Sequence, residues 1–245
     1  MIEIVDETGS TNADLSARLA KGDDLPEGYW LVANRQTAGR GRQGRSWQGG
    51  EGNFIGSTIV HLRDDDPPPA TLSFVAALSV FATIAPLVTA QNRLHLKWPN
   101  DVFLNGGKVA GILLERVGNA VVVGIGVNLA TAPDLPDRPT APLHQAGAKI
   151  ERDAFAASLT ETLRQRLDNW RWREQGMNMG LSATLSGFLW NSIHQAGART
   201  SVNIGAGEVV TGAFAGLDET NGALWLLLDD GTERIIHAGD VILET

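Results

Sequence analysis

The fold class is decided by the stretch Val102-Phe103-Leu104-Asn105-Gly106-Gly107-Lys108-Val109-Ala110, which has the pattern of two short strands joined by a tight turn. Asparagine and glycine supply the positive backbone angles that such a turn requires, so the two strands run antiparallel. Further apolar or β-branched runs bounded by Gly, Asn, Asp or Pro predict strands at 29–34, 54–60, 94–98, 108–115 and 120–128. We therefore expect an α+β protein built on a mixed, largely antiparallel sheet.

Three segments favour helices around this sheet. Ser10, Thr11 and Asn12 are good N-cap residues for a helix that follows them. Residues 70–89 are uncharged and long enough to span a bilayer, but no basic cluster flanks them, so we interpret them as a buried core helix. In 151–173, large apolar residues recur at helical spacing and predict an amphipathic helix whose aromatic residues lie in the core.

After Gly197 the sequence pattern changes to short predicted strands with hairpin turns at Asn221-Gly222 and Asp230-Gly231. This arrangement is typical of a small β-barrel. We expect a first domain over residues 1–195 that carries the chemistry and a second, barrel domain over 196–245.

Composition excludes several classes of function. The chain has 245 residues with a net charge of −8 and a pI near 5.1, which opposes a general nucleic-acid binder. It has no cysteine, and its five histidines are scattered without metal-ligand spacing, so we expect no protein metal site. The first residues lack the basic start and apolar core of a signal peptide, which favours a cytoplasmic protein.

Against this acidic background, the loop Gly39-Arg40-Gly41-Arg42-Gln43-Gly44-Arg45-Ser46-Trp47 concentrates three arginines. Its three glycines allow positive φ and close backbone approach, so amides and guanidinium groups can converge on a phosphate or carboxylate. The alternative for the loop in isolation is a solvated surface segment.

Two other polar patches accompany the loop. Ser10, Thr11 and Asn12 can donate hydrogen bonds to a small polar ligand, although helix capping alone would also explain them. In Lys97-Trp98-Pro99-Asn100-Asp101, proline ends the strand, so Asn100 and Asp101 are expected in a turn with their side chains displayed at its tip. Lys108 opens the next strand and can bring an ammonium close to that carboxylate.

Five motifs occurring in one order resemble those of the biotin-protein ligases. They are 9–12 (Gly-Ser-Thr-Asn), 39–47, 97–101, 108–115 (Lys-Val-Ala-Gly-Ile-Leu-Leu-Glu) and 124–128 (Gly-Ile-Gly-Val-Asn). Each is weak alone, but together they span roughly the first 130 residues. The resemblance implies the biotin-lipoate ligase fold, which is similar to that of class II synthetases, followed by an SH3-like β-barrel.

The resemblance also implies an activity: an ATP- and Mg²⁺-dependent enzyme that forms biotinyl-5'-adenylate and then transfers biotin to a lysine of a biotin carboxyl carrier protein. Its catalytic residues would be Arg40, Arg42, Lys108 and Asp101, with Asp101 positioning the acceptor lysine. The residues implied for biotin binding are Ser10, Thr11, Asn12, Gln36, Gly39, Arg40, Gly41, Arg42, Lys108 and Gly111. Those implied for nucleotide binding are Arg42, Arg45, Trp47 and Asn128.

Some members of that family carry an N-terminal helix-turn-helix and repress transcription, but only six residues precede Glu7 here. We therefore expect a monofunctional ligase that binds no DNA and no membrane; a homodimer is left open. Three alternatives remain. The first is a lipoate-protein ligase, which also activates its substrate by adenylation but usually has a different loop. The others are a module that binds RNA through residues 39–47 and an inactive relative that keeps the fold.

Overall fold

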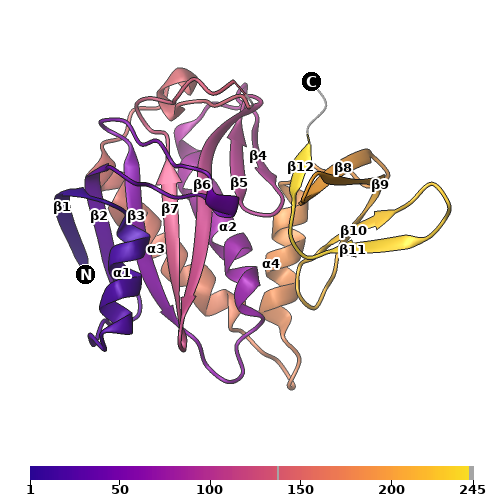
Figure 1. Ribbon diagram of the computed structural model, residues 1–245, viewed down its shortest axis with the longest axis horizontal. Coiled ribbons are helices and arrows are strands. Elements are labelled where there is room, and N and C mark those ends of the chain that lie inside the picture. The colour runs from indigo at the N-terminus through magenta and orange to yellow at the C-terminus, as the bar shows by residue number, and fades with distance from the viewer. Residues whose placement is uncertain (137, 243–245) are drawn as a thin grey trace.

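The computed structural model describes residues 1–136 and 138–242 and arranges them around two sheets (Figure 1). The larger sheet has seven strands in the order β1-β2-β3-β7-β6-β5-β4. These are β1 (Ile2–Thr8), β2 (Trp30–Gln36), β3 (Phe54–His61), β4 (Leu94–Lys97), β5 (Asp101–Leu104), β6 (Gly107–Val117) and β7 (Ala120–Val127). Strand β1 pairs parallel with β2 and the other neighbours pair antiparallel, which confirms the α+β class with a mixed, largely antiparallel sheet.

The hairpin that indicated this class is formed by β5 and β6. Leu104 pairs with Gly107 across the turn, and the two residues between them have positive φ angles, 50° at Asn105 and 84° at Gly106. The pairing of β5 with β6 shifts in register between Val102 and Phe103. This irregularity lies next to Asp101, so the hairpin both sets the sheet direction and shapes the edge that carries a candidate site residue.

Helices cover both faces of the large sheet (Figure 1). Helix α1 (Thr11–Ala20) packs over Leu31 and Ile59 on one face. Helices α2 (Leu72–Ile84) and α3 (Arg152–Trp170) pack against the opposite face, where Val32 and Val60 point, as the period-2 alternation of strands requires. The predicted helix over 70–89 is shorter, because Pro69–Thr71 and Ala85–Leu87 form 3-10 turns at its ends.

The apolar character of the segment Pro69–Leu87 has a structural explanation. By length and composition alone it is apolar enough to cross a membrane, but 67% of its most apolar window is buried inside the protein. Helix α2 contacts the sheet, α3 and α4 (Met179–Trp190), so most of its surface faces other elements. A helix that is apolar all round is expected in such a central position.

Strand β1 and helix α4 lie outside the predicted set of elements. The side chains of β1 alternate between partly buried and exposed at the edge of the sheet, which leaves only a weak apolar pattern. Helix α4 begins at an N-cap, Asn178, whose side chain accepts a hydrogen bond from the backbone N–H of Leu181. It lies between the two sheets along the chain (Figure 1).

The second sheet follows α4 and has the order β11-β10-β9-β8-β12, with every pair antiparallel. Its strands are β8 (Arg199–Gly205), β9 (Glu208–Leu217), β10 (Leu224–Leu227), β11 (Glu233–Ile236) and β12 (Asp240–Ile242). Gly222 and Gly231 have positive φ in the predicted turns. Buried Phe214 and Leu224 belong to the same apolar core as Phe74 of α2, so the boundary at 195/196 stays a proposal.

Arg171, which directly follows α3, forms ion pairs with residues of two segments that are distant in sequence. Its Nη1 lies 2.7 Å from Glu27 Oε1, and its Nε lies 3.0 Å from Asp66 Oδ1; the Arg171 and Asp66 side chains are 7% and 4% exposed. Burial alone would raise the pKa of Glu27, but the hydrogen bonds and charge of Arg171 outweigh burial and hold that pKa below its ordinary 4.5. The Glu27 carboxylate is therefore ionised at neutral pH.

We expect Arg171→Ala to lower the free energy of unfolding by about 3–5 kcal/mol, because it leaves a buried carboxylate without its partner. Since the folded pKa of Glu27 is lowered, its contribution is present above pH 4.5 and is lost as pH falls through the folded value. Urea denaturation of wild type and variant at pH 7 and pH 3.5 measures both effects. The matched control Arg164→Ala breaks an exposed pair with Glu161 and should leave the midpoint unchanged; equal loss in both variants would contradict the prediction.

Candidate functional site

A pocket opens between the first turn of α1, the middle of β3, β6 and β7, and the loop that follows β2. With its mouth it encloses about 980 Å³ of empty space. The predicted site residues that line it are Ser10, Thr11, Asn12, Gln36, Arg40, Gly41, Arg42, Arg45, Trp47, Asp101, Lys108, Gly111 and Asn128. Residues of all five motifs therefore surround one cavity, and Gly39 is the predicted residue outside its wall.

The loop over 39–47 is a closed structure held by its own backbone. Gly41 N–H donates to Arg45 C=O at 2.7 Å, and Trp47 N–H donates to Gly39 C=O at 2.9 Å. Positive φ occurs at Gly44 (72°) and at Gln43 (57°), whereas Gly41 is extended. Of the three glycines, Gly44 therefore uses the positive φ that glycine allows.

Gly39 has a packing role instead of a conformational one. A Cβ at this position would lie 2.5 Å from the backbone oxygen of Trp47 and 2.8 Å from Nε2 of Gln36. Only glycine lets the two arms of the loop come this close. Gly39 thus supports the loop from behind and does not itself face the cavity.

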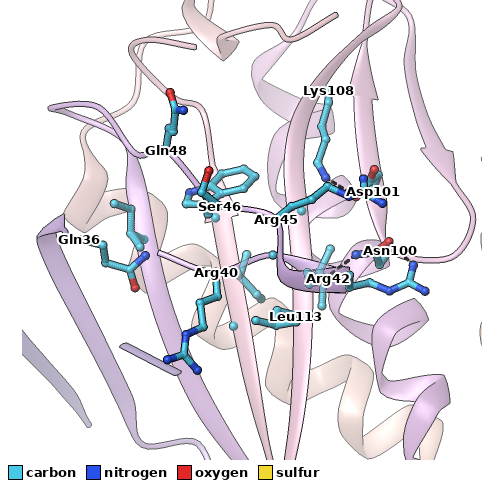
Figure 2. A pocket seen from close by; sticks show the side chains of 18 of the residues that line it. Gln36, Arg40, Arg42, Arg45, Ser46, Gln48, Asn100, Asp101, Lys108 and Leu113 are labelled. Atoms are coloured by element: carbon cyan, nitrogen blue, oxygen red, sulfur yellow. Dashed lines mark hydrogen bonds and ion pairs between the residues drawn. The ribbon is translucent and has the colours of Figure 1, made fainter. Parts of the chain in front are cut away.

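The arginines of the loop point in different directions (Figure 2). Nη1 of Arg42 lies 3.1 Å from Asn100 Oδ1 and 3.4 Å from the backbone oxygen of Gly239. Arg45 forms an ion pair with Asp240 at the start of β12, while Arg40 is exposed. Burial lowers the pKa of Arg42 and the charge of Asp101 opposes this, so the guanidinium stays cationic beside the cavity.

The expected turn is present at residues 98–100, but the side chains of Asn100 and Asp101 are not displayed at its tip. Asn100 is 8% exposed, and its Nδ2 donates to the backbone oxygen of Ile112 at 2.6 Å, because a buried amide must be satisfied by hydrogen bonds. Asp101 is the first residue of β5, not a displayed turn residue. Its Oδ1 lies 2.6 Å from Nζ of Lys108, with both side chains less than one-fifth exposed, so the anticipated ammonium-carboxylate pair is present (Figure 2).

His194 also contacts this segment through a hydrogen bond. The spacing of the histidines in the sequence did not predict this contact. Nε2 of His194 accepts a hydrogen bond from the backbone N–H of Trp98 at 3.0 Å, across 96 residues of sequence. Burial and the nearby charge of Lys97 lower the pKa of His194 to about 4. The ring is therefore neutral at pH 7, as a hydrogen-bond acceptor must be.

A largely buried polar network contributes to another part of the pocket wall. Asn12 Nδ2 donates to Glu115 Oε2 at 2.7 Å, Ser57 Oγ donates to Asn12 Oδ1 at 2.6 Å, and Ser57 Oγ lies 2.7 Å from Thr11 Oγ1. Thr11 Oγ1 lies 3.0 Å from Gln36 Oε1, which also accepts from the backbone N–H of Thr11. Ser57 was not predicted; its one sequence signal is a hydroxyl in the otherwise apolar centre of β3.

Glycines in β6 and β7 make room for the side chains of the site. A Cβ at Gly124 would lie 2.2 Å from Asn12 Oδ1, and one at Gly126 would lie 2.2 Å from the Trp47 ring. At Gly111 the clash would be with Nζ of Lys108 at 2.9 Å and with Trp47 at 3.3 Å. Trp47 and Asn12 therefore lie directly on the backbone of the sheet. The absence of a side chain at Gly111 leaves room for Lys108.

Apart from Oδ1 of Asp101, which is ion-paired with Lys108, two polar atoms at this site are buried without a hydrogen-bond partner among the described residues: Nε1 of Trp47 and Oδ1 of Asn128. Asn128 is 2% exposed, so its free acceptor cannot be satisfied by bulk water. Within residues 1–136 and 138–242, no group of three His, Asp or Glu side chains is placed to hold a metal ion. The N–H of Trp47 and the oxygen of Asn128 are therefore available to a polar ligand.

Comparison with known families agrees with the geometry. Residues 8–131 match the model of the Biotin/lipoate A/B protein ligase family, and residues 200–244 match the Biotin protein ligase C terminal domain. The chain belongs to the biotin/lipoate A/B protein ligase family. Its family match contains the arginine loop, the polar network and the Lys108–Asp101 pair.

Similar proteins within this family align over nearly the whole chain. A biotin–[acetyl-CoA-carboxylase] ligase of Mycobacterium tuberculosis is 38% identical over 98% of this chain and 88% of its own length. One of Paracoccus denitrificans is 36% identical over 96% of this chain and 97% of its own. The biotin protein ligase of Aquifex aeolicus, solved with biotin and ATP, is 24% identical and superposes with a TM-score of 0.81 over 98% of this chain and 97% of its own, which shows the same fold.

Proposed function

We propose that this protein is a biotin-protein ligase that forms biotinyl-5'-adenylate from biotin and ATP and transfers the biotinyl group to a lysine of a biotin carboxyl carrier protein. The proposal rests mainly on the composition of one cavity. Its lining combines neutral polar side chains, arginine side chains and the Lys108–Asp101 ion pair. The relatives named as biotin–[acetyl-CoA-carboxylase] ligases support it.

In the first half-reaction, a carboxylate attacks the α-phosphate of ATP, which brings two anions together. Positive charge fixed at the reacting atoms stabilises this transition state more than the separated substrates. Arg42 and Lys108 are partly buried cations of the site, and the exposed Arg40 adds further positive charge. Ser10, Thr11, Asn12 and Gln36 then bind the ureido end of biotin, and its apolar tail runs along the sheet.

The nucleotide occupies the side of the cavity formed by Arg45, Trp47 and Asn128. The unsatisfied Oδ1 of Asn128 is an acceptor for an amino group such as that of adenine, and the Trp47 ring offers an apolar surface. The described residues offer no carboxylate cluster, so Mg²⁺ would reach the site with the triphosphate and neutralise charge on the leaving pyrophosphate.

In the second half-reaction, the acceptor lysine must lose a proton before it attacks the mixed anhydride. Asp101 lies beside Lys108 at the cavity and is the carboxylate placed to orient that ammonium. We expect this chemistry to take place in the cytoplasm, with a carrier protein and neither DNA nor a membrane as partner; a homodimer is compatible with it.

Asp101→Asn separates the two half-reactions. We expect adenylate formation to fall less than about tenfold and transfer to the carrier to slow about a hundredfold, the range typical of losing a group that handles a proton. Single-turnover transfer from preformed biotinyl-adenylate to carrier protein measures the second step. The control Asp229→Asn removes an exposed carboxylate of the second sheet and should change neither rate; a larger loss in adenylation than in transfer would assign Asp101 to the first step.

Biotin-dependent exchange of pyrophosphate into ATP tests the activity directly. Exchange with biotin, and not with lipoate or octanoate, is the expected result with purified protein and Mg²⁺. Exchange with lipoate alone would make the protein a lipoate-protein ligase, and exchange with none of the acids would remove the adenylation proposal.

A further inference from the structure

The amide side chain of Asn53 joins two segments that are far apart in the sequence. Asn53 directly precedes β3, and its Oδ1 accepts hydrogen bonds from the backbone N–H groups of Ala130 at 2.9 Å and Thr131 at 3.1 Å. Its Nδ2 donates to the backbone oxygen of Thr131 at 2.9 Å. Because Asn53 is 3% exposed, these backbone groups satisfy its amide in place of bulk water.

These hydrogen bonds continue the pairing of β3 with β7 beyond the end of the strands. The last paired residues of the two strands are Phe54 and Val127. Beyond them, the side chain of Asn53 offers one acceptor oxygen and one donor N–H group to the chain that follows β7, as a backbone peptide group of a further strand residue would. Asn53 therefore fixes the position of Ala130 and Thr131 relative to β3.

Two glycines allow the joined segments to approach this closely. A Cβ at Gly50 would lie 2.2 Å from Oγ1 of Thr131, and a Cβ at Gly52 would lie 2.9 Å from Cβ of Ala130. Gly52 also has a positive φ of 76°, and the backbone N–H of Asn53 donates to Gly50 C=O at 3.2 Å, which closes a turn. Residues 50–53 therefore fit the chain after β7 by packing as well as by hydrogen bonding.

Each of the joined segments carries part of the cavity wall. Trp47 lies shortly before Asn53, and Pro133 and Leu135 lie shortly after Thr131. Trp47, Pro133 and Leu135 line the cavity, whereas Asn53 does not. Asn53 therefore acts on a ligand through the residues that it positions.

The contacts of Asn53 affect one side of the cavity. Asn128 is anchored independently of them, because its backbone N–H donates to Val109 C=O at 2.8 Å and its Nδ2 donates to Lys108 C=O at 3.3 Å. Loss of the Asn53 amide should therefore release the chain that follows Asn128, from Thr131 onward, and leave the floor formed by β6 and β7 in place. The first turn of α1 lies on other elements and should also be unaffected.

We propose that Asn53 is a positioning residue for the nucleotide, which holds the chain after Asn128 against the segment that carries Trp47. The proposal rests on the proposed function, which places ATP beside Trp47 and Asn128. Fixing these two segments before ATP arrives removes an ordering cost that would otherwise weaken nucleotide binding. The bond-forming step depends on Arg42 and Lys108, which are held by contacts with other residues, so the role of Asn53 is in ATP binding and not in the chemical step.

Two measurements on the full chain test the proposal. Calorimetric titration with α,β-methylene-ATP and Mg²⁺, with and without biotin, measures nucleotide binding, and pyrophosphate exchange gives kcat and the KM values for ATP and biotin. Asn53→Ala should weaken binding of the analogue and raise KM for ATP at least about tenfold, because three hydrogen bonds to the chain after β7 are lost. The KM for biotin, and kcat at saturating ATP, should change less than about threefold.

A conservative variant and a matched control separate positioning from general destabilisation. Asn53→Asp keeps an oxygen that accepts both N–H groups but loses the N–H donor, so it should recover part of the lost affinity for ATP. Asn119 lies outside the cavity lining, and its Nδ2 donates to the backbone oxygen of Leu62 at 2.7 Å. Asn119→Ala therefore also removes an amide that binds a distant backbone group, but it should leave the KM for ATP unchanged.

The outcomes distinguish this proposal from the proposed function. An unchanged KM for ATP in Asn53→Ala, an equal loss for biotin and ATP, or the same rise in KM for ATP in Asn119→Ala would overturn the positioning role. Wild-type protein that binds the ATP analogue but supports exchange with lipoate and not with biotin would instead overturn the proposed function. Titration of the variants with the analogue would then still decide the role of Asn53.

Discussion

Replacing Arg42 with alanine is expected to lower biotin-dependent pyrophosphate exchange at least about a thousandfold. The guanidinium is held between Asn100 and the backbone oxygen of Gly239, so its charge is already oriented before substrate arrives. Because burial weakens solvent screening at this position, the charge acts strongly on an anionic transition state. The measurement is exchange of labelled pyrophosphate at saturating biotin and ATP.

Two control variants test whether the loss is specific to the guanidinium of Arg42. Arg42→Lys keeps the charge but not the forked donors, so it should recover part of the activity. Arg152→Ala removes a partly buried arginine of α3 that does not line the pocket, and should leave exchange unchanged. Exchange by Arg42→Ala within tenfold of wild type, with an unchanged melting temperature, would refute the role assigned to the loop.

Replacing Lys108 with methionine is expected to slow adenylate formation by about a hundred- to a thousandfold. Methionine keeps much of the length of the side chain but removes the ammonium that lies 2.6 Å from Asp101. The variant also leaves a carboxylate that is 17% exposed without its ion partner, which adds repulsion toward an incoming anion. Rapid-quench measurement of biotinyl-adenylate in a single turnover isolates this step.

The double variant Lys108→Met with Asp101→Asn separates the two causes. If the lost ammonium limits the reaction, adenylate formation stays slow after the carboxylate is neutralised. Recovery to near wild-type rates in the double variant would show that the unpaired carboxylate, and not the missing cation, was responsible.

The sequence was sufficient for those features that rest on local patterns. The Asn105-Gly106 turn and the core positions of α3 follow from turn chemistry and periodicity, whereas the clustering of the three polar patches was implied by the family resemblance. The largest error was the expectation that the side chains of Asn100 and Asp101 are displayed at a turn tip. The Asn100 side chain instead hydrogen-bonds to β6, and Asp101 forms an ion pair with Lys108. A proline in the motif indicated where the strand stops but not which way the following side chains turn.

Long-range partners were beyond reach because no local pattern encodes them. His194 meets Trp98 across 96 residues, Asp240 pairs with Arg45 from the second sheet, and Ser57 joins Asn12 from the middle of a strand. The glycines of β7 were visible as part of a motif, but their purpose depends on the side chains of other elements that lie over them. Such contacts become apparent only when the tertiary arrangement is known.

The two sides of the cavity differ in mechanical character. Its floor is the backbone of β6 and β7, two central strands that are hydrogen-bonded to each other along their length, whereas the loop at 39–47 forms another side. A floor of paired backbone opens only by breaking the sheet, which is slow, while a loop moves on much shorter timescales. We therefore expect the loop to set the rates at which a ligand enters and leaves, so that substitutions in it change residence time even where they leave equilibrium contacts intact.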